Sequence, residues 1–275
     1  MSQPRRLTDR NALSRNRARA ASSTLSACFL HEQAMSELKE RLSEVNRKFI
    51  QPAIVTGFPE TWRPLLPEAR IVADEDVLDL AEGAHDLVIH GLSLHWADDP
   101  VGQLIQSRRA LQPDGLFLAT TFGGRTLQEL RATLGQAESE VMGGMSPRVL
   151  PMGEIRDLGA LLQRAGFALP VADSVIHDVS YRDIFHLMHD LRAMGETNAL
   201  ADRRRIATRR AIFRRAAELY TQSYPADDNR VVASFEIITL TGWAPAPDQP
   251  QPLRPGSAVA RLSDALGTTE TKLKN

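Results

Sequence analysis

The chain has 275 residues, of which 43% are hydrophobic and 24% are charged, a composition typical of a globular protein with a sizeable core. The formal net charge is −1, so no field of the whole protein favours nucleic acid or an anionic membrane. The single cysteine, Cys28, excludes an intrachain disulfide and fits a reducing compartment. No apolar run approaches the roughly 20 residues that a membrane-spanning helix needs.

The N-terminus is rich in arginine. Arg5, Arg6, Arg10, Arg15, Arg17 and Arg19 are offset there by Asp9 alone. An arginine-rich, serine-containing and acid-poor segment is typical of a mitochondrial transit peptide. The alternative, which we favour, is a basic helix of the mature protein. Apolar residues then recur at helical spacing, so residues from about Leu7 to Lys48 are predicted to form one or two helices.

The segment Asp86–Phe122 predicts a strand, a helix and a second strand. Asp86–His90 is a short apolar run, typical of a buried parallel strand. Asp99 followed by Pro100 supplies an N-cap and a proline for the first helical turn. Pro113-Asp114-Gly115 ends that helix and leads into Leu116–Thr120. Such a crossover indicates a parallel sheet and therefore an α/β fold.

The segment before this crossover is unusually short. Pro52–Gly57 reads as a strand that ends in a glycine, and Arg70–Asp74 as another strand. The prolines at 59, 64 and 67 leave room for barely two helical turns between the two strands.

Several motifs resemble known families. The run RRALQPDGLFLATTF and the loop Ser93-Leu94-His95-Trp96 resemble the fourth and fifth strands of class I S-adenosylmethionine (SAM) methyltransferases, the loop being similar to that of the biotin-pathway malonyl-carrier-protein methyltransferase. Further segments resemble the methyltransferase-like assembly factors of respiratory complex I from alphaproteobacteria and mitochondria. These segments are GGMSPRVLPM (143–152), RDLGALLQRAGFALPV (156–171), DLRAMGETNAL (190–200), TGWAP (241–245) and LRPGSA (253–258).

The resemblance implies an α/β, Rossmann-like class I methyltransferase sheet. This sheet is mostly parallel with an antiparallel last strand at Val231–Thr241, and is shortened by one strand. We expect N-terminal helices over 1–48, a methyltransferase-like domain over 49–243 and a proline-rich tail over 244–275. Helical insertions are expected at 123–153 and 182–223, with a helix at about Ala201–Tyr220.

The missing strand can be assigned in two ways. In the first, Arg70–Asp74 is the second strand, Asp74 or Glu75 is the acid that binds the cofactor ribose, and the third strand is absent. In the second, residues 73–76 correspond to the acidic segment after the third strand, and the second strand is absent. The resemblance implies SAM beside Gly57, Asp74 and Glu75, with Leu94 and Trp96 contributing to its pocket.

The candidate substrate residues lie in two regions. Ser93 and His95 follow a parallel strand at its carboxyl end, where open α/β sheets bind ligands, and are the candidate catalytic residues. Arg148, Arg192, Glu196 and Asn198 belong to segments that cover the pocket mouth in the related proteins, and we expect them to contact a substrate or partner. No metal centre is predicted, because His186 and His189 have no evident third ligand.

The resemblance implies work on a respiratory complex I subunit, which the protein modifies or holds during assembly. One alternative is a scaffold that has lost SAM binding. A second is an RNA-binding protein that uses the arginines of the helix at 201–220; nothing indicates DNA binding. The expected location is the bacterial cytoplasm, where the protein can associate peripherally with the inner face of the membrane, or the mitochondrial matrix in a eukaryote.

Overall fold

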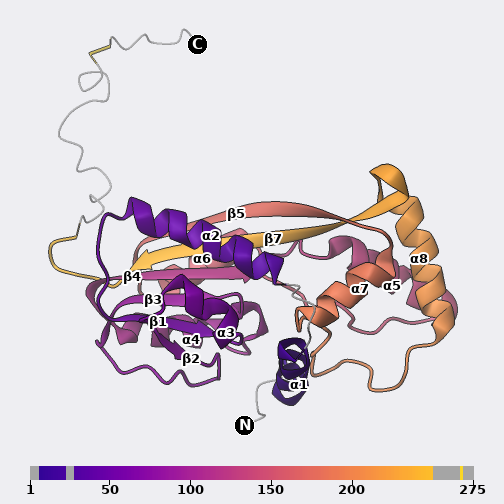
Figure 1. The fold of residues 1–275 in the computed structure, drawn as a ribbon, viewed down its shortest axis with the longest axis horizontal. Coiled ribbons are helices and arrows are strands. Elements are labelled where there is room, and N and C mark those ends of the chain that lie inside the picture. The colour runs from indigo at the N-terminus through magenta and orange to yellow at the C-terminus, as the bar shows by residue number, and fades with distance from the viewer. Residues whose placement is uncertain (1–5, 23–27, 250–266, 269–275) are drawn as a thin grey trace, which may run out of the picture. The chain divides into compact units, whose positions relative to one another are not determined.

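The computed structural model describes residues 6–22, 28–249 and 267–268. The chain divides into two compact units, 1–245 and 246–275. The first unit holds every helix and strand discussed below (Figure 1). The sequence motif at 253–258 lies outside the described residues, as does most of the predicted tail.

One seven-stranded sheet forms the centre of the first unit, in the order β2-β1-β3-β4-β7-β5, with β6 paired to β7. β1 to β4 are parallel, whereas β7 runs antiparallel to both β4 and β5. The predicted fold class is confirmed. The strands are β1 (Pro52–Thr56), β2 (Arg70–Val72), β3 (His85–Gly91), β4 (Leu111–Phe122), β5 (Ala168–Tyr181), β6 (Pro225–Ala226) and β7 (Arg230–Trp243).

The short edge of the sheet is where the predicted strand is missing. β2 pairs in parallel with β1, with Ala53 opposite Arg70 and Val55 opposite Val72. Within the described ranges, no further strand lies outside β2. β2 is therefore the edge strand next to β1, the position of the second strand in the first assignment.

Helices cover both faces of this sheet. They are α1 (Arg10–Ala21), α2 (Phe29–Glu44), α3 (Pro59–Trp62), α4 (Pro100–Ala110), α5 (Gln128–Met142), α6 (Ile155–Arg164), α7 (Ile184–Ala193) and α8 (Arg210–Ser223). Single 3-10 turns occur at Arg63–Leu65, Leu94–Trp96 and Asp227–Asn229. Among the residues that the structure describes, no helix is long and apolar enough to cross a membrane.

The alternation of side chains along the strands divides the core into two layers. Ile54 and Ile89 belong to a cluster that includes Leu30 and Leu38 of α2, on one face. Their chain neighbours Val55 and Val88 belong to a second cluster with Leu104 of α4 and Leu162 of α6. Full burial stabilises each such aliphatic side chain by about 1.5–3 kcal/mol, so the two layers hold the sheet in register.

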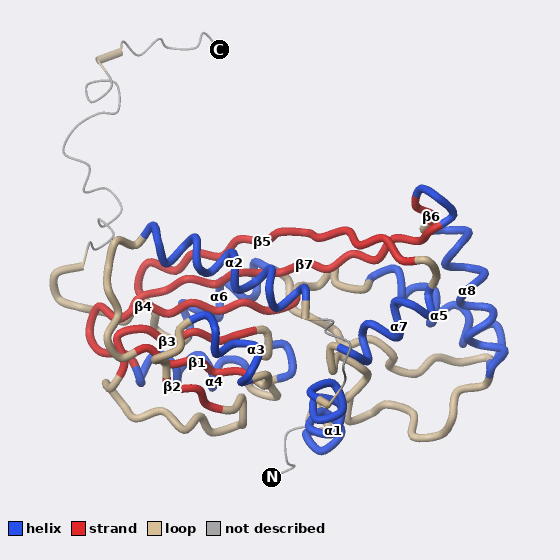
Figure 2. Tube along the Cα trace, in the orientation of Figure 1, coloured by secondary structure: helices blue, strands red, loops and turns tan. Residues whose placement is uncertain are grey.

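β5 and β7 continue beyond the rest of the sheet. β4 ends opposite Ile237, but β7 goes on pairing with β5 as far as Val231. α5, α7 and α8 gather around this extension (Figures 1 and 2). The extension thus carries helices that the short parallel part of the sheet could not hold.

Two helices end in glycine, and a third helix begins later than predicted. Gly166 and Gly195 follow α6 and α7 with φ of +83° and +78°, the left-handed conformation that favours glycine. The helix predicted to begin at about Ala201 begins only at Arg210. The reason is that residues 200–205 are bound to the N-terminus: Ala201 N donates to the carbonyl of Leu7, and Arg203 pairs with Asp9.

Candidate functional site

The site lies at the carboxyl ends of β1, β2 and β3, where α1 crosses the end of the sheet. The N-terminus of α1 is held in several ways. Asp9 caps the helix by accepting a hydrogen bond from Ala12 N at 3.0 Å, and its own N–H donates to the carbonyl of Ala199 at 2.7 Å. Leu7 N and Thr8 N donate to one oxygen of Asp98 at 2.8 and 2.9 Å. These hydrogen bonds fix the N-terminus of α1 at the site.

A cavity of about 730 Å³ lies between α1 and the strand ends. Three of the predicted cofactor residues, Gly57, Asp74 and Glu75, line it together. The helix side of the same cavity is lined by Arg10, Leu13, Ser14, Arg17 and Ala18. The strand side of this cavity thus consists of residues that the sequence singled out, and its helix side comes from the first of the N-terminal helices.

Arg17 occupies the space directly above Gly57. A Cβ atom added to Gly57 would lie 2.2 Å from the guanidinium carbon of Arg17. The same guanidinium donates to both carboxylate oxygens of Asp74, at 2.7 and 3.0 Å. Arg10 also donates to the main-chain carbonyl of Asp74 and lies 3.5 Å from a carboxylate oxygen of Glu75.

These contacts bear on whether SAM fits. Binding of this cofactor in a nucleotide-binding sheet requires backbone free to approach it at a glycine and an acid free to bind its ribose. Here Gly57 is covered by Arg17, and both oxygens of Asp74 are engaged. A single glycine, followed by Phe58 and Pro59, also replaces a glycine-rich turn. In this arrangement the residues do not fit the cofactor, despite the size of the cavity.

Leu94 and Trp96 do not face this cavity. Leu94 is buried in the core cluster on the α4 face. Trp96 lines a second cavity, of about 260 Å³, on the other side of the site. The structure therefore places these two predicted cofactor residues elsewhere.

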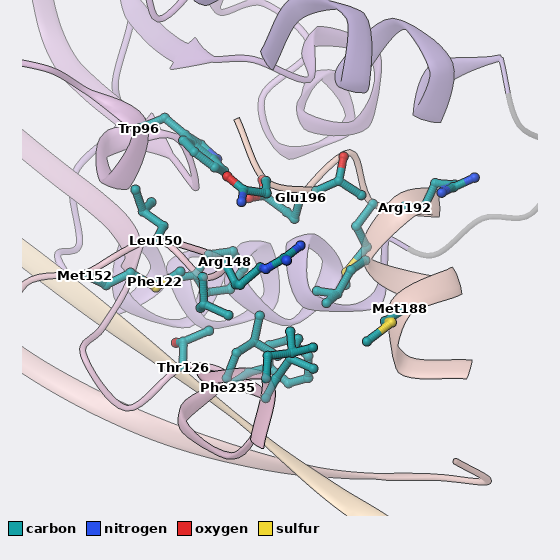
Figure 3. Close-up of a pocket in the computed structure, with 18 of the residues that line it drawn as sticks. Trp96, Phe122, Thr126, Arg148, Leu150, Met152, Met188, Arg192, Glu196 and Phe235 are labelled. Carbon is teal, nitrogen blue, oxygen red and sulfur yellow. The ribbon is translucent and has the colours of Figure 1, made fainter. Parts of the chain in front are cut away.

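The second cavity, called the Glu196 pocket below, is mostly apolar (Figure 3). Trp96 and Glu196 lie close together at one end of it, and Arg148 projects between its walls (Figure 3). Met194 lines both this pocket and the cavity under α1. The other lining residues include Phe122, Thr126, Leu127, Leu130, Leu134, Val149, Leu150, Met152, Met188, Leu191, Arg192, Phe213 and Phe235.

Glu196 connects the two sequence motifs at the pocket end. Its Oε2 accepts a hydrogen bond from Trp96 Nε1 at 2.8 Å and lies 3.3 Å from His95 Nε2. Burial alone raises the pKa of Glu196, but His95, the charge of Arg17 and the Trp96 hydrogen bond together hold this pKa below its usual range. The second oxygen, Oε1, is buried without a hydrogen-bond partner among the described residues.

The candidate catalytic residues lie deeper than expected. The His95 side chain is only 1% exposed, and its ring packs 4.9 Å from that of Phe122. Ser93 is buried, with its Oγ 3.3 Å from His90 Nδ1. Burial lowers the pKa of His90 to about 4, so this histidine is neutral near pH 7. Ser93 therefore contacts a neutral core histidine and lines neither cavity.

The other residues predicted to contact a substrate or partner, Arg148, Arg192 and Asn198, have different surroundings. Arg148 donates to Glu138 at 2.6 Å and to Thr208 Oγ1 at 2.6 Å, although it also lines the Glu196 pocket. Asn198 donates to the carbonyl of Pro147 at 2.8 Å, which joins two of the motif segments. Arg192 is exposed and lines the same pocket.

His31 was missed by sequence reasoning. Its Nδ1 accepts a hydrogen bond from Trp62 Nε1 at 2.9 Å, and its ring lies 4.6 Å from that of Phe58. Burial lowers the pKa of His31 to about 4, and the nearby charge of Arg17 acts in the same direction. No spacing in the sequence relates these residues, because α2 meets α3 only in the folded chain.

The arginines predicted to form one basic helix are divided. Arg203 and Arg205 pair with Asp9, and Arg204 lies 3.7 Å from Glu138. On α8 itself, Arg215 pairs with Glu140 and Glu218. No group of three or more His, Cys, Asp or Glu side chains that could hold a metal ion occurs in the described part of the chain.

Comparisons with known proteins agree with the fold. The fold is that of a class I methyltransferase-like protein, and 78% of the chain aligns with the whole of the YcgJ protein from Bacillus subtilis, with a TM-score of 0.51 and 9% sequence identity. No family model matches the sequence. Among curated proteins, the malonyl-[acyl-carrier protein] O-methyltransferase of Xylella fastidiosa is 36% identical over 65% of this chain and 59% of its own length.

Matches that cover more of the chain are found to the mitochondrial arginine-hydroxylase NDUFAF5. The zebrafish (Danio rerio) protein is 36% identical over 83% of this chain and 72% of its own length. The rat (Rattus norvegicus) protein is 38% identical over 75% of this chain, and the match spans 60% of that relative's length. The chain belongs to the methyltransferase-like family of NDUFAF5.

Proposed function

We propose that this protein is an assembly factor for respiratory complex I that takes an arginine side chain of a subunit into the Glu196 pocket. The resemblance of its motifs to complex I assembly factors supports a role in the assembly of that complex. The name of its NDUFAF5 relatives, arginine-hydroxylase, supports arginine as the recognised side chain. The observation that carries the proposal is that Oε1 of Glu196 has no hydrogen-bond partner within the described part of the chain.

A buried carboxylate with one free oxygen favours a cationic partner. The Glu196 side chain is 7% exposed, and Oε2 is already used by Trp96 and His95. A buried acceptor atom without a hydrogen bond is costly, and a guanidinium that donated to Oε1 would remove that cost. The carboxylate is ionised near pH 7, because its pKa lies below the usual range.

The walls of the pocket suit the rest of an arginine side chain. Trp96, Phe122 and Phe235 present aromatic surface, on which an aliphatic stem packs and a guanidinium stacks. The positive charge of Arg148 is offset by Glu138, so it repels an entering cation less than a free arginine would. Arg192 is exposed and could meet a carbonyl or acidic group of the partner.

Holding a subunit is favoured over modifying it, because the residues around Gly57 do not fit SAM as arranged. A SAM-dependent modification is the second candidate, and the cavity of about 730 Å³ favours it. Calorimetric titration of the full chain with SAM and with its demethylated product separates them. No heat supports holding, whereas micromolar binding supports modification.

Arginine recognition is tested with the purified chain and immobilised peptides of complex I subunits that carry an arginine. We expect retention of the wild-type protein on these peptides, loss of retention when the arginine is replaced by glutamine, and loss with the Glu196→Gln variant. Glu140→Gln, an exposed position on α5, is the matched control. Equal retention of all variants would contradict the proposal. The proposed site of action is the bacterial cytoplasm near the membrane, or the matrix in a eukaryote.

A further inference from the structure

We infer that Arg17 is an internal ligand of the cavity under α1: its guanidinium stands where the methyltransferase fold holds a cofactor, and Asp74 is its receptor. This inference does not depend on arginine recognition at the Glu196 pocket. It concerns a different cavity and follows from the disagreement between the fold and the residues around Gly57.

The first argument is that the guanidinium of Arg17 fills the place over Gly57. The Cβ of an alanine at position 57 would lie 2.2 Å from two guanidinium atoms of Arg17 and 2.6 Å from a third. These distances are far shorter than ordinary contacts between nonbonded atoms. The backbone at Gly57 therefore lies against a side chain of the protein itself, as it would against a bound ligand.

The second argument is that the receptor is built for a guanidinium. Arg17 and Asp74 form two parallel hydrogen bonds, and their side chains are 11% and 5% exposed. Such a fork-to-fork pair selects guanidinium over ammonium by geometry. The Arg17 guanidinium also lies 5.3 Å above the centre of the Phe58 ring, within the range of a cation–π interaction.

The third argument is that α1 holds Arg17 in place on both sides. Upstream, Asp9 is bound to Ala199 and to Arg203. Downstream, a Cβ on Gly195 would lie 3.3 Å from the Cα of Arg17, so α1 packs closely against the end of α7. Arg17 is therefore presented to Asp74 by a docked helix.

The consequence is that Arg17→Ala leaves a vacant guanidinium site between Gly57 and Asp74. Methylguanidinium at millimolar concentration is the probe, and the melting temperature of the full chain is the readout. We expect a lower melting temperature for Arg17→Ala than for wild type, and a rise of several degrees when methylguanidinium is added. Methylammonium is expected to have a much smaller effect.

Two controls define the site. Methylguanidinium is expected to leave the wild-type protein unchanged, because the site is filled, and to leave Arg17→Ala/Asp74→Asn unchanged, because the receptor has lost its charge. Glu196→Gln is expected to leave the rescue intact when introduced into Arg17→Ala, so this result is independent of the proposed function. Failure of methylguanidinium to stabilise Arg17→Ala would overturn the inference.

The inference stays testable if Arg17→Ala does not fold. Asp74→Asn keeps the shape of the receptor and removes its charge, and a melting temperature equal to that of wild type would contradict the assignment. Micromolar binding of SAM by the wild-type protein would also contradict it, because the cofactor and Arg17 would need the same space.

Discussion

The carboxylate of Glu196 lies 3.3 Å from Nε2 of His95, although 101 residues separate them in the sequence. This contact joins the loop after β3 to the segment after α7. The two segments are separate motifs in the sequence. In the folded chain they lie together at one end of the Glu196 pocket. Trp96 completes the contact by donating to the same carboxylate oxygen.

Trp96→Phe tests the role of that donor. Phenylalanine keeps most of the aromatic wall but cannot donate to Glu196, so a buried charge loses a hydrogen bond worth about 1.5–3 kcal/mol. We expect a decrease of that size in the free energy of unfolding, together with weaker retention on arginine peptides. Chemical denaturation and the peptide assay measure the two effects. Unchanged stability would show that the hydrogen bond contributes little.

Gly57→Ala is predicted to expel the Arg17 guanidinium from Asp74. The expected loss is roughly 1–3 kcal/mol of unfolding free energy, less than for a fully orphaned buried charge because Arg10 remains near Asp74. In an Arg17→Ala background the same change is expected to be nearly neutral. A double-mutant cycle by urea denaturation measures this coupling. Additive effects would contradict the close contact between the two residues.

Because burial lowers the pKa of His31, we predict that the protein loses stability in mild acid. Its pKa is about 4 in the folded protein and about 6.5 in an unfolded chain, so the unfolded state binds more protons between these values. The free energy of unfolding is not affected by the titration of His31 above pH 6.5. It decreases as the pH falls toward 4, by at most roughly 3 kcal/mol. His90 acts in the same direction.

The control for this pH effect is His31→Asn. Its side-chain oxygen can still accept the hydrogen bond of Trp62 Nε1, but it does not titrate. Melting temperatures measured from pH 7 to pH 5 are expected to fall less steeply for this variant than for wild type. The same slope in both proteins would mean that His31 does not titrate as described.

Arg148→Met is predicted to destabilise the fold rather than to affect recognition alone. The side chain of Glu138 is 1% exposed, and Arg148 is its closest cationic partner. Burial raises the pKa of Glu138, but hydrogen bonds from Arg148 and Ser146 outweigh this effect and lower the pKa to about 2. We expect a loss of roughly 1–3 kcal/mol at pH 7, measured by denaturation. A variant as stable as wild type would contradict a structural role.

The sequence predicted the parallel strands well because their apolar runs are local signals. The strand predicted at Pro52–Gly57 is observed at Pro52–Thr56, and the last strand, predicted at Val231–Thr241, is observed at Arg230–Trp243. The helix at 201–220 was overextended because its first half satisfies helical propensity but is bound to Asp9 and Leu7. Such long-range contacts leave no periodic trace in the sequence.

Part of the candidate site could be predicted because some of its residues directly follow strands. Gly57, Asp74 and Glu75 follow strands, and the ends of neighbouring parallel strands must lie close together. Arg17 could not be distinguished from the other N-terminal arginines, because its role depends on where α1 docks. Likewise, nothing local indicates that one oxygen of Glu196 is left without a partner among the described residues.

The most direct test of the whole account is restoration of complex I in the source organism after deletion of this gene. The amount of assembled complex is measured by native gel electrophoresis after complementation with wild type, Glu196→Gln or Glu140→Gln, each at equal protein level. We predict restoration by wild type and Glu140→Gln, and failure of Glu196→Gln. Full restoration by Glu196→Gln would contradict the claim that this carboxylate receives the subunit.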